Sequence, residues 1–181
     1  MKKLLLLFTL LISVAVSAQK INWMTMNEAI AAQQKAPKKI FVDVYTNWCG
    51  PCKMLDKNTF SNPDVAAYIN KHFYAVKFNG EGNESITLGD REFTNPNFDP
   101  ARTRTRNSPH QFARFMGVRA YPTMLFIESD GKLINKVASY LTPNQLEVYL
   151  KMYASGDYKT IDSQEKFNEY YKNFKPTFQT K

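Results

Sequence analysis

The chain has 181 residues, 44% of them hydrophobic and 22% charged, which is long enough for one globular domain with its own core. Seven Gly and nine Pro are no excess, which argues against fibrous and wholly disordered architectures. Two Cys are too few for a scaffold held by several disulfides, and they allow one intramolecular pairing. The formal net charge of +8 favours acidic partners or anionic surfaces, but no nucleic-acid-reading motif is present, so we expect no nucleic-acid partner.

The first 18 residues have the features of a cleaved secretory signal. Lys2 and Lys3 precede an apolar run over residues 4–16, and Val16-Ser17-Ala18 supplies the small-x-small pattern of a signal-peptidase site. The run is too short for an ordinary membrane span, although a retained anchor is the alternative. We therefore expect export across the inner membrane to the periplasm, cleavage after about Ala18, and a mature chain with 22 basic and 16 acidic side chains.

Hydrophobic periodicity predicts helices and strands that alternate along the mature chain. The run Ile40–Tyr45 is apolar at nearly every position, as is typical of a strand buried on both faces of its sheet. Asp43 interrupts this run, and a charged residue inside a buried strand is unusual. The other expected elements are helices over 24–35, 53–58, from 61 onward, from 142 onward and over 163–174, and strands over 74–78, 123–127 and 133–137.

This order of elements implies an α/β fold with a mixed sheet flanked by helices. The thirty residues Gly80–Pro109 do not fit a compact unit, because a loop of this length without regular structure is uncommon there. They are polar, rich in Asn, and carry Arg102, Arg104 and Arg106 on alternate positions. They form either a solvated surface insertion or a flap or docking surface beside a functional site, and the sequence leaves both open.

The two Cys lie in Trp48-Cys49-Gly50-Pro51-Cys52-Lys53, directly after the predicted buried strand and at the start of a helix. The first Cys would sit at a helix N-terminus, where unpaired N–H groups and the positive end of the helix dipole stabilise a thiolate. This context predicts that Cys49 is the nucleophile and the more exposed of the two. Cys52, a turn further on, would be sheltered and would resolve a mixed disulfide. Gly50 and Pro51 keep the loop compact and modulate the preferred redox form.

Other interpretations of the Cys pair stay open. A disulfide across so short a loop would constrain the unfolded chain little, which disfavours a purely structural bond. A zinc site needs about four ligands, and His72 and His110 stand far apart with no paired spacing, so we expect no metal. A redox-inert pair is compatible with the sequence, whereas the strand–CxxC–helix context favours redox chemistry.

The segment from Ile40 to Lys53 resembles the active-site strand and helix start of the thioredoxin family. Tyr121-Pro122-Thr123 before an apolar strand resembles that family's cis-proline element, and WCGPCK after such a strand is a highly specific motif. The likeness spans about residues 23–153, apart from the insertion. The segment Thr59–Val65 is closer to periplasmic thioredoxin-like proteins, such as the C-terminal domain of the disulfide-interchange transmembrane reductases. The resemblance implies a thioredoxin fold.

The resemblance also implies roles for further residues. Asp43 matches the family's buried acid, which assists deprotonation of the resolving Cys; burial would raise its pKa and make it a usable base. An acid satisfied by local hydrogen bonds is the alternative. Lys77 matches the lysine that pairs with this acid, although a solvent-facing strand lysine is an equal alternative. Pro122 matches the cis-proline that faces the Cys pair. The substrate groove is expected to include Trp48, Gly50, Pro51, Tyr121 and Pro122.

The sequence departs from the family at several positions. Tyr45 stands where thioredoxins usually carry Trp, and Asn47 replaces a common acidic or small residue. Tyr121 precedes Pro122 where smaller residues are usual, so the relatives' choice of partner does not carry over. The expected domain covers residues 19–181, with an insertion over 80–109 and a C-terminal extension over 154–181. The extension is aromatic enough to pack back on the domain, through Phe167, Tyr170, Tyr171 and Phe174.

These features predict an exported thiol–disulfide oxidoreductase that reduces protein disulfides through Cys49 and Cys52. The expected partners are disulfide-containing protein substrates and an electron-donating thiol–disulfide protein, for which a membrane reductase is a candidate. No metal or organic cofactor is required, and we expect a monomer. Two alternatives stay open: a disulfide isomerase or oxidase that uses the same residues, and a redox-inert binding module that holds a partner with the groove and residues 80–109.

Overall fold

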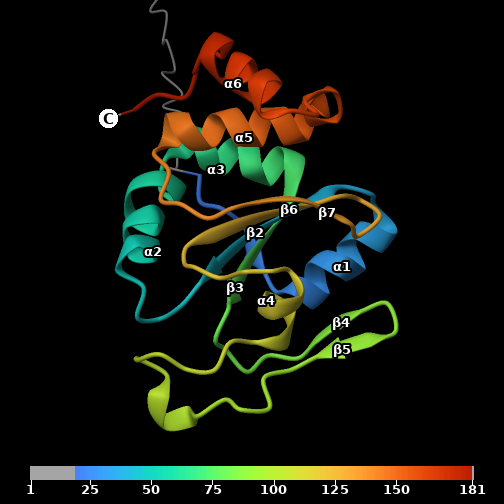
Figure 1. Ribbon diagram of the computed structural model, residues 1–181, viewed down its shortest axis with the longest axis vertical. Helices are drawn as coiled ribbons and strands as arrows, with labels where there is room; N and C mark the ends of the chain where they lie inside the picture. The colour runs from blue at the N-terminus through green and yellow to red at the C-terminus, as the bar shows by residue number, and fades with distance from the viewer. Residues whose placement is uncertain (1–18, 181) are drawn as a thin grey trace, which may run out of the picture.

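The apolar run before the Cys pair forms the central strand of a five-stranded mixed sheet in the computed structural model, which describes residues 19–180 (Figure 1). Strand β2 (Lys39–Tyr45) lies between β3 (Phe73–Asn79), which is parallel to it, and β6 (Thr123–Ile127), which is antiparallel. β1 (Trp23–Met24) pairs with the outer side of β3, and β7 (Leu133–Val137) pairs with β6. The predicted mixed α/β sheet is confirmed.

Helices cover both faces of this sheet and enclose a hydrophobic core on each. On one face lie α2 (Gly50–Leu55), α3 (Pro63–His72) and α5 (Pro143–Ser155); on the other lie α1 (Met26–Lys35) and α4 (Gln111–Phe115) (Figure 1). Along β2, Phe41 joins the first core, whereas Val42 and Val44 join the second. Since side chains alternate along a strand, Asp43 points to the same face as Phe41. That face is the one against which α2 packs.

Polar side chains fix where these helices begin. Thr25 and Glu28 form a capping box at the start of α1, so Met24 is left in β1 instead of joining the helix predicted from residue 24. Asn62 accepts hydrogen bonds from the backbone N–H groups at the start of α3, where Pro63 is the first helical residue. The predicted helical stretch over 53–58 is present: α2 continues after the Cys pair into a π-helical turn, η1 (Asp56–Phe60).

Residues 80–109 contain more regular structure than their polar composition predicts. They include an antiparallel hairpin of β4 (Ile86–Leu88) and β5 (Arg91–Phe93) and a 3-10 turn, η2 (Pro100–Arg102). The two isolated apolar residues Ile86 and Phe93 are buried in the second core. The expectation of a loop without regular structure is therefore wrong, because these two side chains attach the hairpin to the domain. Helix α4 directly follows this insertion and was not predicted.

The C-terminal extension packs back on the face that carries α5. It contains η3 (Asp157–Thr160) and α6 (Gln164–Asn173), and Phe167 stacks on Tyr149 with ring centroids 5.8 Å apart. Tyr171 is exposed, because it lies on the outer side of α6. Within residues 19–180, no helix is long and apolar enough to cross a membrane. The predicted signal over residues 1–18 lies outside the described residues.

Candidate redox site

Cys49 and Cys52 form a disulfide at the N-terminus of α2. Cys49 is the N-cap residue, and its Sγ accepts a hydrogen bond from the backbone N–H of Cys52 at 3.1 Å. Each Cys exposes only 2% of its surface, whereas Gly50 and Pro51 are exposed. The prediction that Cys49 is the more exposed of the two is wrong for this oxidised form. Its side chain folds back over the first helical turn, where its sulfur is bonded to that of Cys52.

Asp43 is fully buried in β2 and faces a single cation. Its Oδ2 lies 2.6 Å from Lys77 Nζ, which comes from the neighbouring position on β3. Its Oδ1 has no hydrogen-bond partner among residues 19–180. Burial raises the pKa of Asp43 to about 6, while the charge of Lys77 opposes that rise. The carboxyl group is thus poised to exchange a proton near neutral pH.

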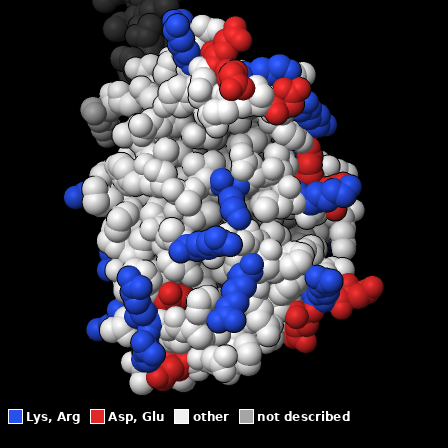
Figure 2. All heavy atoms as spheres, in the orientation of Figure 1, with Lys and Arg blue, Asp and Glu red and all other residues white. Residues whose placement is uncertain are grey.

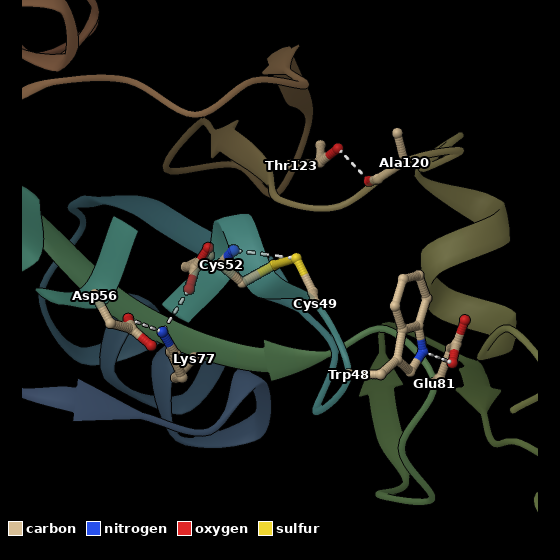
Figure 3. The surroundings of a disulfide bond; sticks show 9 residues. Trp48, Cys49, Cys52, Asp56, Lys77, Glu81, Ala120 and Thr123 are labelled. Carbon is tan, nitrogen blue, oxygen red and sulfur yellow. Dashed lines mark hydrogen bonds and ion pairs between the residues drawn. A yellow bond between two sulfur atoms is a disulfide. The ribbon is translucent and has the colours of Figure 1, made fainter. Parts of the chain in front are cut away.

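Lys77 is shared between two carboxylates and enclosed by aromatic rings. Its ammonium also pairs with Asp56, the first residue of η1 (Figure 3). Burial by itself would lower the pKa of Lys77, but the two carboxylates together raise it above its ordinary value. The ammonium lies 5.0–5.4 Å from three ring centroids, those of Trp23, Tyr45 and Phe60. Tyr45, one of the departures from the family, is therefore part of a cation-binding cage.

The Tyr121–Pro122 peptide bond is cis, as the resemblance implies. Pro122 is buried, and Tyr121 is half-buried with its hydroxyl donating a hydrogen bond to the carbonyl of Gly80 at 3.2 Å. The Tyr121 ring packs edge-on against Trp48, with centroids 5.9 Å apart. A Cβ atom at Gly80 would lie 2.6 Å from this ring, so any larger residue there requires the Tyr121 ring to shift. Burial raises the pKa of Tyr121 to about 12, which keeps its hydroxyl protonated.

Trp48 connects the Cys pair to the insertion. Its indole Nε1 donates a hydrogen bond to Glu81 Oε2 at 2.7 Å, and the same oxygen accepts one from the backbone N–H of Asn107 at 2.8 Å. The guanidinium of Arg106 lies 4.8 Å from the centroid of the Trp48 ring. Figure 3 shows Trp48 and Glu81 on the Cys49 side of the disulfide, with Lys77 and Asp56 on the Cys52 side.

A polar pocket of about 180 Å³ separates the active-site loop from the insertion. Asn47 closes one side, because its side-chain amide donates a hydrogen bond to the carbonyl of Thr103 at 2.9 Å. The buried hydroxyl of Thr46 lines the pocket with no hydrogen-bond partner among the described residues. The insertion is therefore fastened beside Cys49, which favours the docking-surface interpretation over a remote solvated loop.

The two His residues serve the fold. His110 caps α4 through Nδ1, which accepts the backbone N–H of Phe112 at 3.0 Å, and its Nε2 lies 2.7 Å from the carbonyl oxygen of Glu84. His72 ends α3 and stacks on Tyr68. In the described part of the chain, no group of three or more His, Cys, Asp or Glu side chains is arranged to hold a metal ion.

Comparison with known proteins decides the family, because a model of the thioredoxin-like domain matches residues 26–154. The chain belongs to the thioredoxin-like domain family. Its curated relatives include the thiol:disulfide interchange protein DsbD of Photorhabdus laumondii, 28% identical over 72% of this chain. The thioredoxin of Mycoplasmoides gallisepticum is 26% identical over 63% of this chain. The chain spans 19% of the length of that DsbD and 83% of the length of that thioredoxin.

Solved structures place the chain in the thioredoxin fold. A putative disulphide-isomerase from Bacteroides thetaiotaomicron is 29% identical, with a TM-score of 0.52 over 76% of this chain and 95% of that one. A thioredoxin from Thermus thermophilus has a TM-score of 0.57 at 14% identity, over 82% of this chain and 99% of that one. The predicted fold is confirmed. The family, its relatives and the Cys49–Cys52 disulfide support thiol–disulfide oxidoreductase activity, which implies thiol–disulfide redox partners.

Three residues of the site escaped the sequence analysis. Asp56 follows Cys52 by four positions, a spacing that places both residues on the same face of a helix. This spacing is a sequence signal from which Asp56 could have been predicted as a site residue. Glu81 stands just beyond the end of β3, but nothing in its neighbours predicts a bond to Trp48. Arg106 was noted only as part of an alternating arginine pattern. The roles of the residues that were predicted stay predictions, although Asp43 and Lys77 do meet.

Proposed function

We propose that this protein reduces disulfide bonds of protein substrates outside the cytoplasm, with Cys49 as the attacking residue and Cys52 as the resolving one. The observation that carries the proposal is the N-cap position of Cys49 on α2, with a buried acid of raised pKa under the same helix. The helix N-terminus stabilises the Cys49 thiolate once the disulfide is reduced. Asp43 then serves the second half of the reaction.

The reaction takes two exchange steps. The Cys49 thiolate attacks one sulfur of the substrate disulfide, which forms a mixed disulfide and releases the other substrate sulfur as a thiolate. The Cys52 thiol then loses its proton, for which ionised Asp43 is the acceptor, and attacks Cys49 Sγ. The second substrate sulfur leaves as a thiolate, and two electrons have passed from the enzyme to the substrate. The Cys49–Cys52 disulfide of the structure is the product.

A complete cycle needs an external electron donor, because the chain carries only these two Cys and the reaction leaves them oxidised. A membrane reductase is the donor we propose, together with export to the periplasm and a monomeric state. The signal features of residues 1–18 support export. Cell fractionation followed by N-terminal sequencing tests this; a periplasmic chain that starts at Gln19 is expected, recovery in the cytoplasmic fraction alone would contradict export, and an exported chain with an intact Met1 would indicate a retained anchor.

Insulin-disulfide reduction by two Cys variants tests the chemistry. Cys49→Ser should abolish turnover, whereas Cys52→Ser should still attack and accumulate mixed disulfides that reducing agent releases. The two variants are matched controls, because each removes the disulfide but only one removes the nucleophile. Turnover retained by Cys49→Ser would contradict the proposal, whereas a wild-type protein that shows no turnover at all would favour a redox-inert binding module.

Disulfide isomerisation or oxidation is the second candidate, and the likeness to the putative disulphide-isomerase of Bacteroides thetaiotaomicron favours it. The reduction potential of the Cys49–Cys52 pair, titrated against dithiothreitol, separates the two. A value near that of thioredoxin, about −270 mV, indicates a reductase that needs an electron supply. A value of about −180 to −120 mV indicates isomerase or oxidant work.

A further inference from the structure

Three arginines of the insertion have no acidic partner among residues 19–180. Arg102, Arg104 and Arg106 are all exposed, and none of them forms an ion pair with any residue over 19–180. Other exposed basic residues of the chain, such as Lys132 and Lys166, do pair with neighbouring acids. These three charges are therefore available to an external anion.

The arginines are held beside the nucleophile. The Arg106 guanidinium stacks on Trp48, the residue that directly precedes Cys49. Thr103, which lies between the other two arginines, accepts the side-chain hydrogen bond of Asn47. In Figure 1 the segment with η2 lies at the same edge of the molecule as the loop that leads into α2. A substrate chain held at Cys49 therefore passes next to these charges.

The segment is also fixed in shape before any partner binds. Asn107 closes the turn that carries the arginines, because its side chain accepts the N–H of Asp99 at 3.0 Å and donates to the Asp99 carbonyl at 2.8 Å. The backbone N–H of Asn107 donates a hydrogen bond to Glu81 Oε2, which fixes the position of this turn beside Trp48. A surface that is ordered before binding loses less conformational entropy when a partner binds. Less of the free energy of the charge contacts is then offset, so the binding affinity is higher.

Two acids lie beside this segment, the buried Glu81 and the exposed Asp99, so they are outnumbered by the three arginines. Glu81 is 8% exposed, and its Oε2 accepts two hydrogen bonds, while Asp99 Oδ1 accepts the N–H of Ala101. Lys53, just after Cys52, is exposed and adds a further positive charge. Figure 2 shows basic side chains gathered at the edge where the insertion lies, with smaller acidic areas beside them. The surface next to Cys49 is therefore mainly positive.

We propose that the arginines of the insertion select substrate proteins whose target disulfide is flanked by an acidic segment. This rests on the proposed function, because it concerns the chain that is held at Cys49. Oppositely charged surfaces accelerate encounter and fix the register of the two chains, and guanidinium groups match carboxylates in shape. The effect depends on ionic strength, since exposed charges are screened over about 10 Å at 0.1 M salt.

The test compares two peptides that each contain the same disulfide loop, one flanked by Glu and the other by Gln. The wild-type protein should reduce the acidic peptide with kcat/KM about tenfold higher at about 0.01 M salt, and the ratio should approach one at about 0.3 M. The triple variant Arg102→Gln, Arg104→Gln, Arg106→Gln should lower the ratio to about one at both salt concentrations. If this variant unfolds, the single substitution Arg104→Glu is used instead; the Arg104 side chain makes no described contact, and the change lowers the charge of the three positions from +3 to +1, so it should lower the preference clearly without reversing it.

A charge-matched control removes three basic residues elsewhere. Lys35→Gln, Lys159→Gln and Lys172→Gln together change the net charge equally but lie on α1, η3 and α6, so the acidic-to-neutral ratio should stay near ten. If this control variant loses the preference as fully as the arginine variant, net charge decides and the proposed surface is wrong. Equal rates for both peptides with the wild-type protein also overturn the inference but leave the reductase intact. If neither peptide is reduced, the proposed function itself fails.

Discussion

The two sides of the Cys49–Cys52 disulfide differ in almost every physical respect. The Cys52 side contains a buried carboxylate, one lysine and three aromatic rings, all supplied by the sheet and its adjoining helices. The Cys49 side contains Trp48, Glu81 and an exposed arginine, of which the last two are supplied by the insertion. Charges on the Cys52 side act in a low dielectric and shift pKa values, whereas the arginines on the Cys49 side lie at the surface and are screened by salt. Proton chemistry and partner choice are thus built by different parts of the chain.

Removal of the buried acid should lower turnover more than any other substitution outside the Cys pair. It should change the chemistry of the Cys52 side and leave substrate preference, which belongs to the Cys49 side, unchanged. We expect Asp43→Asn to lower turnover of any disulfide substrate about 100-fold at pH 7, because Cys52 loses its proton acceptor. The salt dependence and the acidic-substrate preference should not change, since they belong to the Cys49 side. Steady-state kinetics on the two peptides measure both quantities, and a change in the preference would contradict the separation.

The same substitution should stabilise the fold at high pH. The pKa of Asp43 is raised to about 6 in the folded state, so the folded protein holds this proton more tightly than the unfolded chain does. The resulting contribution to the free energy of unfolding is complete below about pH 4 and is lost as the pH rises through 6. At pH 8 the ionised carboxylate lowers the free energy of unfolding, so Asp43→Asn should raise it by about 1–3 kcal/mol. Urea unfolding of the oxidised protein at pH 4 and pH 8 measures this. Asp56→Asn is the matched control, because that acid is half-exposed and should give no such gain.

Replacement of the lysine tests whether the two charges act as a pair. Lys77→Met leaves Asp43 buried with no cation, which should lower the free energy of unfolding by about 3 kcal/mol at pH 8. The pKa of Asp43 should then rise further, so the loss should shrink as the pH falls and the carboxyl group becomes neutral. The acidic limb of the pH–rate profile should move to higher pH. Lys77→Arg keeps the charge and serves as control; an unchanged profile in Lys77→Met would show that the pair does not set the pKa.

The Cys52 side was largely predictable from sequence, because it depends on short-range patterns. The continuous apolar run of β2 located the sheet, the anomaly at Asp43 marked the buried acid, and CxxC at a helix start indicated the redox pair. The Cys49 side was not predictable, because the bond between Trp48 and Glu81 arises only when β3 places its end beside the active-site loop. β1, with two residues, is too short to leave a periodic signal.

Loss of Glu81 should affect the Cys49 side alone. Glu81→Ala removes the acceptor shared by the Trp48 indole and the Asn107 backbone, so the free energy of unfolding should fall by about 2 kcal/mol. The insertion should loosen with it, which lowers the preference for the acidic peptide while the pH–rate profile stays in place. Protease cleavage within residues 99–107 measures the loosening. An altered pH–rate profile in this variant would show that the two sides are coupled.

The smallest effect concerns the close approach of Gly80 to Tyr121, which ties the insertion to the cis-proline loop. Gly80→Ala places a Cβ atom 2.6 Å from the Tyr121 ring, so the ring must shift and the free energy of unfolding should fall by about 1 kcal/mol. In a Tyr121→Leu background the new methyl group has room, and the same change should cost much less. The two single variants and the double variant, unfolded in urea, form a cycle that isolates this contact. Equal losses in both backgrounds would mean that Gly80 is needed for another reason and that its contact with Tyr121 does not anchor the insertion.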